Sequence, residues 1–479
     1  MYVSAEILDL HTQVDEIAVD KLLEVQIKEN ERKIIVLDDD PTGVQTVHDI
    51  SVYTDWTIDS IRRGFLEPNN LFFILTNSRS MTEEMTKAVH ADIVANIAAI
   101  AKETDKAYLI ISRSDSTLRG HFPLETETLR TGMVAQGIHI DGEILCPFFK
   151  EGGRFTINNV HYVKQNDMLI PAAESEFARD KTFAYTKSSL PEYIEEKTCG
   201  SYNADQVICI ELETLRAGDI HKVEQQLLSV NDFNKVCVNA VDYIDLKVFA
   251  VGLYRAMAKG KNFIFRTAAS FVKIIGGVSE QPLLTRKDML TEETSNGGIV
   301  VVGSYTKKTT MQLERLRQLD FVVPIEFKSN LVLKGDAAFY SEVERCVEES
   351  EKAIMSGKTA VCYSCRELLV MENDTPESAL IRSVKISNGI QSLVGCLKVI
   401  PSFIIAKGGI TSSDVGTKAL LVKCAKVLGQ IKPGIPVWQT GNESRFPSTP
   451  YVIFPGNTGD ESTLREIVEI LSGKENTVQ

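Results

Sequence analysis

The chain has 479 residues, of which 43% are apolar and 24% charged, and its formal net charge at pH 7 is −13. This length exceeds one ordinary hydrophobic core, so we expect two large domains in a folded globular protein. The acidic balance and the lack of a basic stripe exclude a nucleic-acid partner. No stretch is apolar enough to span a bilayer, and the first 30 residues carry acids unlike a signal peptide, so we expect no membrane partner and a cytoplasmic location.

The nine cysteines are scattered along the chain, and several lie inside apolar runs. This distribution indicates reduced, mostly buried thiols. Cys362 and Cys365 form the one close pair, but no second pair follows at zinc-ribbon spacing, so a structural role is favoured over a metal site.

Residues 1–30 have apolar positions at roughly helical spacing, which predicts an N-terminal helical arm. Strand-like runs then alternate with helical patterns, and a clear helix is expected from about Met81 to Lys102. This alternation predicts an α/β fold of two domains, each with a largely parallel sheet flanked by helices. The strand-like runs are 34–37, 71–75, 108–111, 143–146, 206–210, 235–239 and 263–266, followed by 299–302, 360–363, 403–406, 437–440 and 451–454.

Two polar segments interrupt the alternation. Residues 281–298 contain Pro282 and Gly297-Gly298 without clear periodicity, which predicts a linker between a first domain at 31–280 and a second at 299–472. Residues 150–180 are polar and loop-rich, and their length indicates a functional excursion or lid. Phe177 and Phe183 are expected to pack this excursion onto the first domain.

The segment from Phe403 to Asp414 reads as a buried strand, a Gly408-Gly409 turn and a helix. Thr411 and Asp414 have the spacing of a capping box, and we expect the helix to include Val427 and to stop at Gly429. Glycines let the backbone approach an anion, and the N–H groups of the first helical turn point at it, so the pattern suits a phosphate. A plain β-turn-α connection is the alternative.

Two further polar turns follow strands of the second domain, at Gly303-Ser304 and at Pro455-Gly456-Asn457. In open α/β sheets, ligands bind outside the carboxyl ends of the strands, so the three turns together predict a nucleotide or phosphate site. Neither a P-loop nor a G-x-G-x-x-G fingerprint occurs, and a nucleotide would be held by a less common arrangement.

Three adjacent aspartates, Asp38, Asp39 and Asp40, directly follow the first strand. Their carboxylates repel one another unless a positive or hydrogen-bonding group binds there. A metal, a basic partner or a polyol bound there would reduce this repulsion. The alternative is a solvated turn stabilised by proline and glycine.

Arginines and a further aspartate follow the next strands: Arg79 after the second strand, and Arg113, Asp115 and Arg119 at and after the third. Arginine offers a planar fork for a carboxylate, and aspartate can accept sugar hydroxyls or take a proton from one. This mixed set suits a small hydroxy acid. In the excursion, His161 is a candidate catalytic histidine, although a lone histidine is more often structural.

Five motifs occur in the order of the four-carbon acid sugar kinase family, once described as a domain of unknown function. They are Asp39-Asp40-Pro41-Thr42-Gly43, Asp115-Ser116-Thr117-Leu118-Arg119-Gly120, Gly303-Ser304, Gly408-Gly409-Ile410-Thr411 and Pro455-Gly456-Asn457. The second motif is the most specific, and Gly153-Arg154 and residues 266–270 are also similar to the family. The chain therefore resembles this family over about residues 30 to 470.

The resemblance implies an ATP-dependent carbohydrate kinase that phosphorylates threonate, erythronate or an oxo-tetronate in the cleft between a sugar domain and a nucleotide domain. Carried over by position, Asp39, Asp40, Asp115, Arg119 and Arg154 belong to the sugar side, and Ser304, Gly408, Gly409, Ile410, Thr411 and Gly456 hold ATP. To these we add Thr42, Arg79 and Arg113 for the substrate, and Lys407 and Asn457 for the nucleotide. One of the three catalytic candidates Asp39, Asp40 and Asp115 would accept the hydroxyl proton, and Mg²⁺ would assist transfer.

Three positions depart from the family, which usually has an acidic residue at Ile410, an alanine at Asp38 and a bulky apolar residue at Pro41. The departures bear on the substrate more than on the reaction. Two alternatives remain open: a non-catalytic protein that binds nucleotide and sugar acid, and a sugar-acid isomerase or dehydrogenase. The missing dinucleotide fingerprint argues against the dehydrogenase. The expected partner is a small acid sugar, and a homodimer is kept as a candidate assembly.

Overall fold

The computed structural model describes residues 2–9, 14–290, 294–366, 369, 371, 374–456 and 458–474. It divides into two compact units. The first comprises Met1–Val47 and Asp55–Glu280, and the second comprises His48–Thr54 and Gln281–Gln479. The chain therefore enters the second unit briefly after its first long strand, before the main crossing at Gln281.

A seven-stranded parallel sheet forms the centre of the first unit. Its strand order is β10 (Ile208–Ile210), β11 (Asn234–Val238), β6 (Gly142–Cys146), β12 (Phe263–Thr267), β5 (Tyr108–Arg113), β2 (Lys33–Asp38) and β4 (Leu71–Leu75). Because helices cover both faces, the central strands are buried apolar runs, as in other parallel sheets. The predicted α/β fold is confirmed for this unit.

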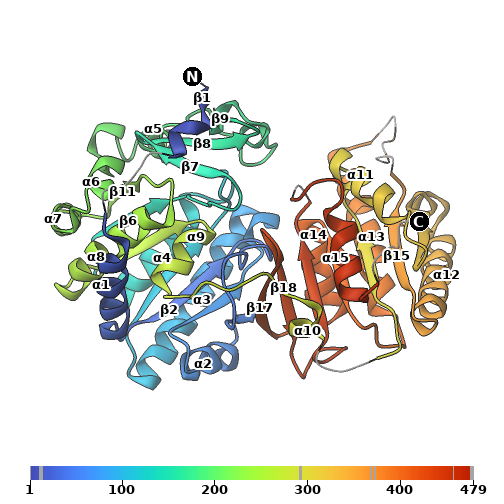
Figure 1. Cartoon of the computed structure of the whole chain (residues 1–479). Helices are drawn as coiled ribbons and strands as arrows, with labels where there is room; N and C mark the ends of the chain where they lie inside the picture. The colour runs from blue at the N-terminus through green and yellow to red at the C-terminus, as the bar shows by residue number, and fades with distance from the viewer. Residues whose placement is uncertain are drawn as a thin grey trace. The chain divides into compact units, whose positions relative to one another are not determined.

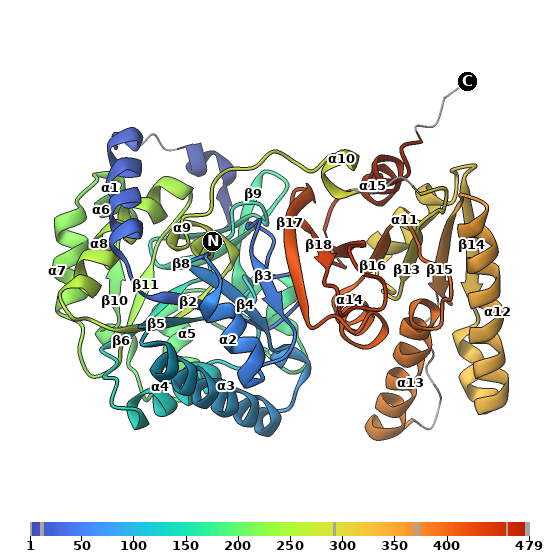
Figure 2. The same cartoon turned by 90° about the horizontal axis from the view of Figure 1, so that it is seen from below.

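Helices lie on both faces of this sheet (Figures 1 and 2). One face carries α1 (Glu16–Glu29), α6 (Leu212–Arg216), α7 (Ile220–Leu228), α8 (Tyr243–Ala258) and α9 (Ala269–Ile275), and the other carries α2 (Ile58–Leu66), α3 (Glu83–Thr104) and α4 (Leu124–Ala135). α3 is the helix expected near residues 81–102, and the Thr82 side chain caps it by accepting from Met85 N. The N-terminal arm contains α1, which packs on α8.

The excursion at 150–180 is not loop-rich, contrary to the prediction. It contains β7 (Arg154–Ile157), β8 (Val160–Gln165) and β9 (Met168–Pro171), and β1 (Val3–Ser4) from the arm pairs with β9 to complete a small antiparallel sheet. Asn158 and Asn159 both have positive φ, 48° and 64°, which suits a two-residue hairpin turn. The short 3₁₀ turns η3 (Ala172–Glu174) and η4 (Glu176–Arg179) follow, and then α5 (Leu190–Lys197).

The sheet of the second unit has eight strands. Their order is β3 (Ser51–Tyr53), β17 (Cys424–Lys432), β18 (Ile435–Thr440), β19 (Pro450–Phe454), β16 (Ile404–Lys407), β13 (Ile299–Val302), β15 (Thr359–Ser364) and β14 (Val322–Phe327). β19, β16, β13, β15 and β14 run parallel, whereas β3, β17 and β18 add antiparallel strands. This largely parallel sheet confirms the predicted fold class of the second domain.

Two helix layers flank this sheet (Figure 2). α11 (Lys307–Leu316) and α15 (Thr463–Ser472) cover one face, and α12 (Asp336–Met355) and α13 (Pro376–Gly395) cover the other. Val300, Val302 and Ile405 pack under Leu313 and Leu464 in one buried cluster, which fixes α11 against the strands. Among its described residues, 281–290 and 294–298, the predicted linker contains the short helix α10 (Arg286–Met289).

The helix after Gly408 is much shorter than predicted. α14 (Gly409–Asp414) continues only through a π-helical turn (Val415–Ala419), and Val427 lies in β17. No capping box forms, because Gly408 is the N-cap and Thr411 lies inside the helix. Residues of β17 alternate between buried and less buried positions, a period of two that marks a strand.

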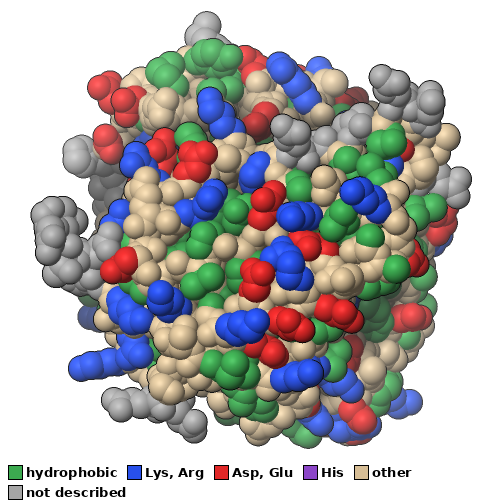
Figure 3. All heavy atoms as spheres, turned by 90° about the vertical axis from the view of Figure 1, so that its right-hand side faces the viewer, with side chains coloured by type: hydrophobic (Ala, Val, Ile, Leu, Met, Phe, Trp, Pro, Cys, Tyr) green, Lys and Arg blue, Asp and Glu red, His purple; other side chains and the backbone are tan. Residues whose placement is uncertain are grey.

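All nine cysteines are described and none forms a disulfide. Cys146, Cys237, Cys346 and Cys362 are buried, whereas Cys199 and Cys396 are exposed. On the face drawn in Figure 3, basic and acidic side chains are interspersed with apolar ones. None of the helices in the described ranges is both long and apolar enough to cross a membrane.

Candidate active site

The aspartates after β2 begin the candidate site at the carboxyl edge of the first sheet. β5 pairs with β2, so Asp38 and Arg113 lie side by side at the ends of their strands, with Oδ1 3.2 Å from Nη1. Both side chains are almost completely buried, and burial raises the pKa of Asp38 to about 7. The Arg113 guanidinium is therefore paired with Asp38 in the protein interior and is not exposed to a ligand.

Arg79 holds the next two carboxylates. It donates from Nη2 to Asp39 Oδ1 at 2.6 Å, from Nε to Asp39 Oδ2 at 3.1 Å, and from Nη1 to Asp40 Oδ2 at 3.3 Å. Thr42 N donates to Asp40 Oδ1 at 2.8 Å. Burial opposes ionisation of Asp40, but Arg79 and Thr42 outweigh it and hold its pKa below the usual value. The positive group that the aspartate run requires is thus an arginine of the chain itself.

Asp115, Thr117 and Arg119 form a second compact group. Arg119 Nε donates to Asp115 Oδ2 at 2.6 Å and to Thr117 Oγ1 at 3.2 Å, and the Thr117 hydroxyl donates to Asp115. Leu118 between them has φ of +68°, a strained conformation for a bulky residue, and Tyr193 Oη donates to its carbonyl at 2.8 Å. Burial opposes ionisation of Asp115, but Arg119 and Arg79 hold its pKa well below the usual range.

Arg154 approaches this group from the first residue of β7. Its Nη1 donates to the Gly152 carbonyl, and no ion pair joins it to a carboxylate within the described ranges. Burial lowers its pKa, and the neighbouring Arg119 acts in the same direction. Arg154 therefore forms no ion pair with a described carboxylate, although the charge of Asp115 favours its charged form from a longer distance.

His161 has a structural role. It is fully buried, its Nε2 donates to Ser116 O at 2.8 Å, and its Nδ1 accepts from Thr156 Oγ1 at 3.0 Å. Burial lowers its pKa to about 4, so the ring is neutral near pH 7. The histidine connects β8 to the Asp115–Gly120 loop, and both of its ring nitrogens are used in these hydrogen bonds.

The three glycine turns of the second unit meet at the carboxyl edge of its sheet. A Cβ placed on Gly456 would lie 3.6 Å from Ser304 Oγ and 4.0 Å from Gly408 Cα. Thr309 Oγ1, on α11, lies 3.2 Å from both Ser304 Oγ and the Gly456 carbonyl. These contacts bring the strand ends of β13, β16 and β19 to one place.

Two of these glycines cannot be replaced without strain. A Cβ on Gly303 would lie 2.1 Å from Thr411 Oγ1, and Gly408 has φ of +117°, which only glycine adopts readily. Gly409 and Ile410 begin α14, and the Ile410 side chain is 67% exposed. Asn457 lies outside the described residues.

Lys407 ends β16 and is completely buried. Its Nζ donates to Pro455 O at 3.1 Å and lies 3.7 Å from the centre of the Phe454 ring, and no described carboxylate pairs with it. Burial, with a smaller contribution from the nearby charge of Lys308, lowers its pKa to about 7. A buried ammonium group with these neighbours is suited to an anion arriving at the same edge.

Arg366, which follows β15 at the same edge, is a further cation that the sequence motifs do not indicate. It donates from Nη2 and Nε to Thr310 Oγ1 at 2.9 and 3.3 Å, and no described carboxylate pairs with it. Its position just after the strand-like run 360–363 was the available signal.

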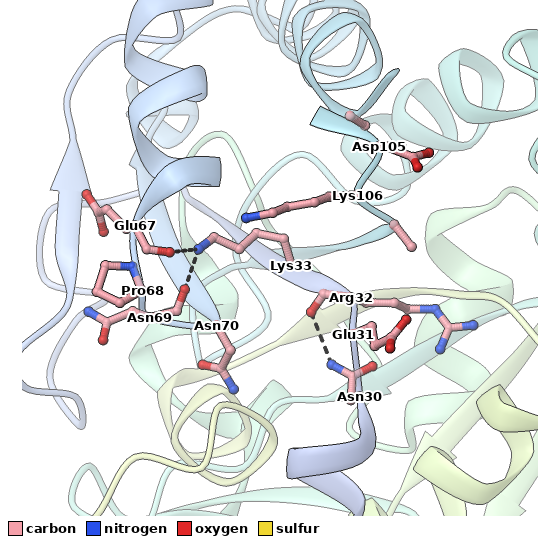
Figure 4. Close-up of a pocket in the computed structure, with 12 residues that line it drawn as sticks. Asn30, Glu31, Arg32, Lys33, Glu67, Pro68, Asn69, Asn70, Asp105 and Lys106 are labelled. Atoms are coloured by element: carbon pink, nitrogen blue, oxygen red, sulfur yellow. Dashed lines mark hydrogen bonds between the residues drawn. The ribbon is translucent and has the colours of Figure 1, made fainter. Parts of the chain in front are cut away.

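A cavity of about 690 Å³ lies away from all these residues, at the amino edge of the first sheet (Figure 4). Lys33 Nζ donates there to Glu67 O at 2.8 Å and to Asn69 O, and Lys106 Nζ donates to Phe65 O at 2.7 Å. These carbonyls lie at or just after the end of α2, where basic side chains commonly satisfy free carbonyls. The lysines thus have a structural role, and the cavity does not contain the candidate catalytic residues.

Both units therefore carry polar side chains at the carboxyl edges of parallel sheets, one edge with carboxylates and arginines and the other with glycine turns and cations. The family model of a sugar-binding N-terminal domain matches residues 34–275, and that of a nucleotide-binding C-terminal domain matches residues 299–464. The chain belongs to the family that combines them, the four-carbon acid sugar kinase family.

Two solved structures share this fold. The Haemophilus influenzae protein HI1011, whose family is defined as a domain of unknown function, is 16% identical, with a TM-score of 0.58 over 91% of this chain and 99% of that one. A Salmonella typhimurium LT2 protein is 15% identical, with a TM-score of 0.65 over 90% of this chain and 97% of that one. No curated protein matches the sequence of this chain.

Proposed function

We propose that this protein is a kinase that transfers the γ-phosphoryl group of ATP to a hydroxyl group of a four-carbon acid sugar of the threonate, erythronate or oxo-tetronate type. The observation that carries the proposal is the state of Arg154. Arg79, Arg113 and Arg119 each contact a carboxylate, whereas Arg154 contacts none among the described residues. The carboxylate of an acid sugar would supply the missing partner.

The nucleotide-binding domain supports ATP as the second ligand. Lys407 and Arg366 are cations without described carboxylate partners, and they stand beside glycine turns whose backbone can approach phosphates closely. Ser304, Gly408, Thr411 and Gly456 would hold the phosphates through backbone N–H groups and hydroxyls. The charge of Lys407 would be neutralised by the bound phosphates.

The three candidate aspartates differ in access to a substrate. Asp39 is bonded twice to Arg79 and its side chain is 2% exposed, and Asp115 is bonded to Arg119 and Thr117. Asp40 has the most exposed carboxylate of the three, at 16%. We assign Asp40 to the acceptor hydroxyl, where it would orient the group and accept its proton.

Mg²⁺ would enter this site with the nucleotide. No group of three or more His, Cys, Asp or Glu side chains within the described ranges could hold a metal, and the aspartate run is already bound by arginines. This agrees with the common behaviour of Mg²⁺, which is held mainly by phosphates and water. When bound, the ion would neutralise charge on the phosphates during transfer.

The protein would therefore contribute to catalysis by binding both substrates, orienting the acceptor hydroxyl and neutralising charge on the phosphates. Arg154 and Arg119 would bind the acid, Asp40 would orient its hydroxyl, and Lys407 would bind the phosphates of the nucleotide.

An ADP-release screen tests the proposal. Mg-ATP is incubated with the protein and each four-carbon acid in turn, with the corresponding polyols and with ATP alone as controls. We expect ADP release that depends on one or a few of the acids. If both ligands bind and no acid causes ADP release, the kinase proposal is wrong and the alternatives, a non-catalytic binding protein or a sugar-acid isomerase or dehydrogenase, are favoured.

A further inference from the structure

The ring of Phe177 contacts both arginines that face the proposed acid site. Its centre lies 5.1 Å from Cζ of Arg119 and 5.3 Å from Cζ of Arg154. Arg119 follows β5 of the large sheet, whereas Arg154 and Phe177 belong to the excursion, in β7 and η4. One aromatic side chain thus holds together two cations from different parts of the domain.

These two guanidinium groups retain donors for a ligand. Within the described ranges, Arg119 uses only Nε among its side-chain donors, and Arg154 uses only Nη1. Asp180 Oδ2 is 3.8 Å from Arg119 Nη1, beyond hydrogen-bond distance. Arg119 Nη1 is thus in an ion pair without a hydrogen bond, and Nη2 of Arg119 and Nη2 of Arg154 have no described partner, so these donors suffice for one carboxylate.

Two adjacent cations repel each other, so something must hold them in one place. The negative face of an aromatic ring attracts a guanidinium within about 6 Å. Phe177 is itself fixed, because it packs against a buried cluster that includes Ala178 and Tyr185. Tyr185 Oη also donates to Thr117 O at 2.8 Å, which ties the excursion to the Asp115–Gly120 loop.

We propose that Phe177 is a positioning residue that aligns Arg119 and Arg154 as a two-guanidinium receptor for the carboxylate, and that this receptor makes the domain select four-carbon acids over neutral polyols. The four-carbon substrate class rests on the proposed function. The excursion then has a defined role: it supplies Arg154 and the ring that positions both arginines.

The test compares binding of a tetronate with binding of the tetritol of the same configuration, measured by calorimetry on the full chain. Phe177→Leu keeps apolar bulk but removes the ring, and we expect it to weaken tetronate binding about 5- to 10-fold with tetritol affinity unchanged. Phe177→Tyr restores the ring and should restore wild-type selectivity. Arg154→Gln serves as a reference, because it gives the loss of tetronate affinity when one guanidinium is absent.

Phe183→Leu is the matched control, because this nearby phenylalanine packs against His121 at 4.9 Å and contacts neither arginine. It should leave the tetronate-to-tetritol ratio unchanged. A second variant, pentafluorophenylalanine at position 177, keeps the shape of the ring and reverses its electrostatic face, and it should reproduce the acid-specific loss even if Phe177→Leu folds poorly.

Equal weakening of tetronate and tetritol, or no weakening of either, overturns the role of Phe177. Because the readout is binding, the two proposals fail separately. Acid-selective binding without ADP release refutes the kinase and leaves the receptor, whereas ADP release with unchanged selectivity in Phe177→Leu refutes the receptor and leaves the kinase.

Discussion

At the residue scale, the three aspartates after β2 show how environment separates identical side chains. Asp38 is buried against Arg113, Asp39 is held by two bonds from Arg79, and Asp40 is partly exposed. Burial raises the pKa of Asp38 to about 7, whereas Arg79 keeps the pKa of Asp40 low. Only Asp40 combines an ionised carboxylate with access to a substrate hydroxyl.

We expect Asp40→Asn to lower kcat about 10²- to 10⁴-fold, because the amide cannot accept the hydroxyl proton. The KM for the acid should change little, since the arginines that bind it are retained. Steady-state kinetics with the active tetronate measures both constants, and Asp105→Asn, an exposed position in the same domain, is the control. If Asp40→Asn keeps near-normal kcat while Asp115→Asn does not, Asp40 is not the base.

Lys407 gives a pH-dependent prediction for the nucleotide. Its pKa is about 7 in the free protein because the ammonium group is buried, and bound phosphates would raise it. Binding at pH 8 should therefore take up a proton, and ATP affinity should fall as pH rises above 7. In the free protein the folded pKa lies below the ordinary value of 10.5, so this group raises stability as pH increases from about 7 toward 10.5.

Calorimetry of ATP binding at pH 8, in buffers of different ionisation enthalpy, measures the proton uptake. We expect an uptake that approaches one proton in the wild type and disappears in Lys407→Met. Lys432→Met, a lysine paired with Glu466 elsewhere in the second unit, is the control and should keep the uptake. The same uptake in Lys407→Met would show that another group titrates.

At the element scale, the parallel strands can be predicted from the sequence because they are buried on both faces and therefore appear as short apolar runs. The sequence does not predict the hairpin β7–β8 because its two strands are short and rich in polar residues, although Asn158-Asn159 is a recognisable turn. The helix after Gly408 was extended too far because Val415, Ala419, Leu420, Val422 and Val427 fit a helical spacing. The strand period of β17 is visible only once its partners β3 and β18 are known.

The N-terminal helix α1 offers a stability test with a built-in control. Leu23 is 6% exposed where α1 packs on the domain, whereas the adjacent Leu22 is 38% exposed. We expect Leu23→Ala to lower the free energy of unfolding by about 2–5 kcal/mol and Leu22→Ala to cost well below that. Urea unfolding followed by circular dichroism measures both, and equal effects would mean that α1 does not pack through Leu23.

At the scale of the whole molecule, sequence motifs predict the sheet edges at which we propose that ligands bind, but they do not predict which charged side chains pair with one another there. Arg79 meets Asp39, and Arg113 meets Asp38, only because β4 and β5 flank β2 in the sheet. The place of Phe177 beside two arginines depends on how the excursion packs. Likewise, β3 pairs with β17 far along the chain, which no local pattern indicates.

Phosphorus NMR of the wild-type protein with Mg-ATP and the tetronate that causes ADP release tests the central claim most directly. The account predicts a new phosphomonoester resonance that grows in equal amount with ADP and is strongly reduced in Asp40→Asn. Release of inorganic phosphate in place of the phosphomonoester would show that the protein hydrolyses ATP without transferring its phosphoryl group to the acid, and would contradict the account.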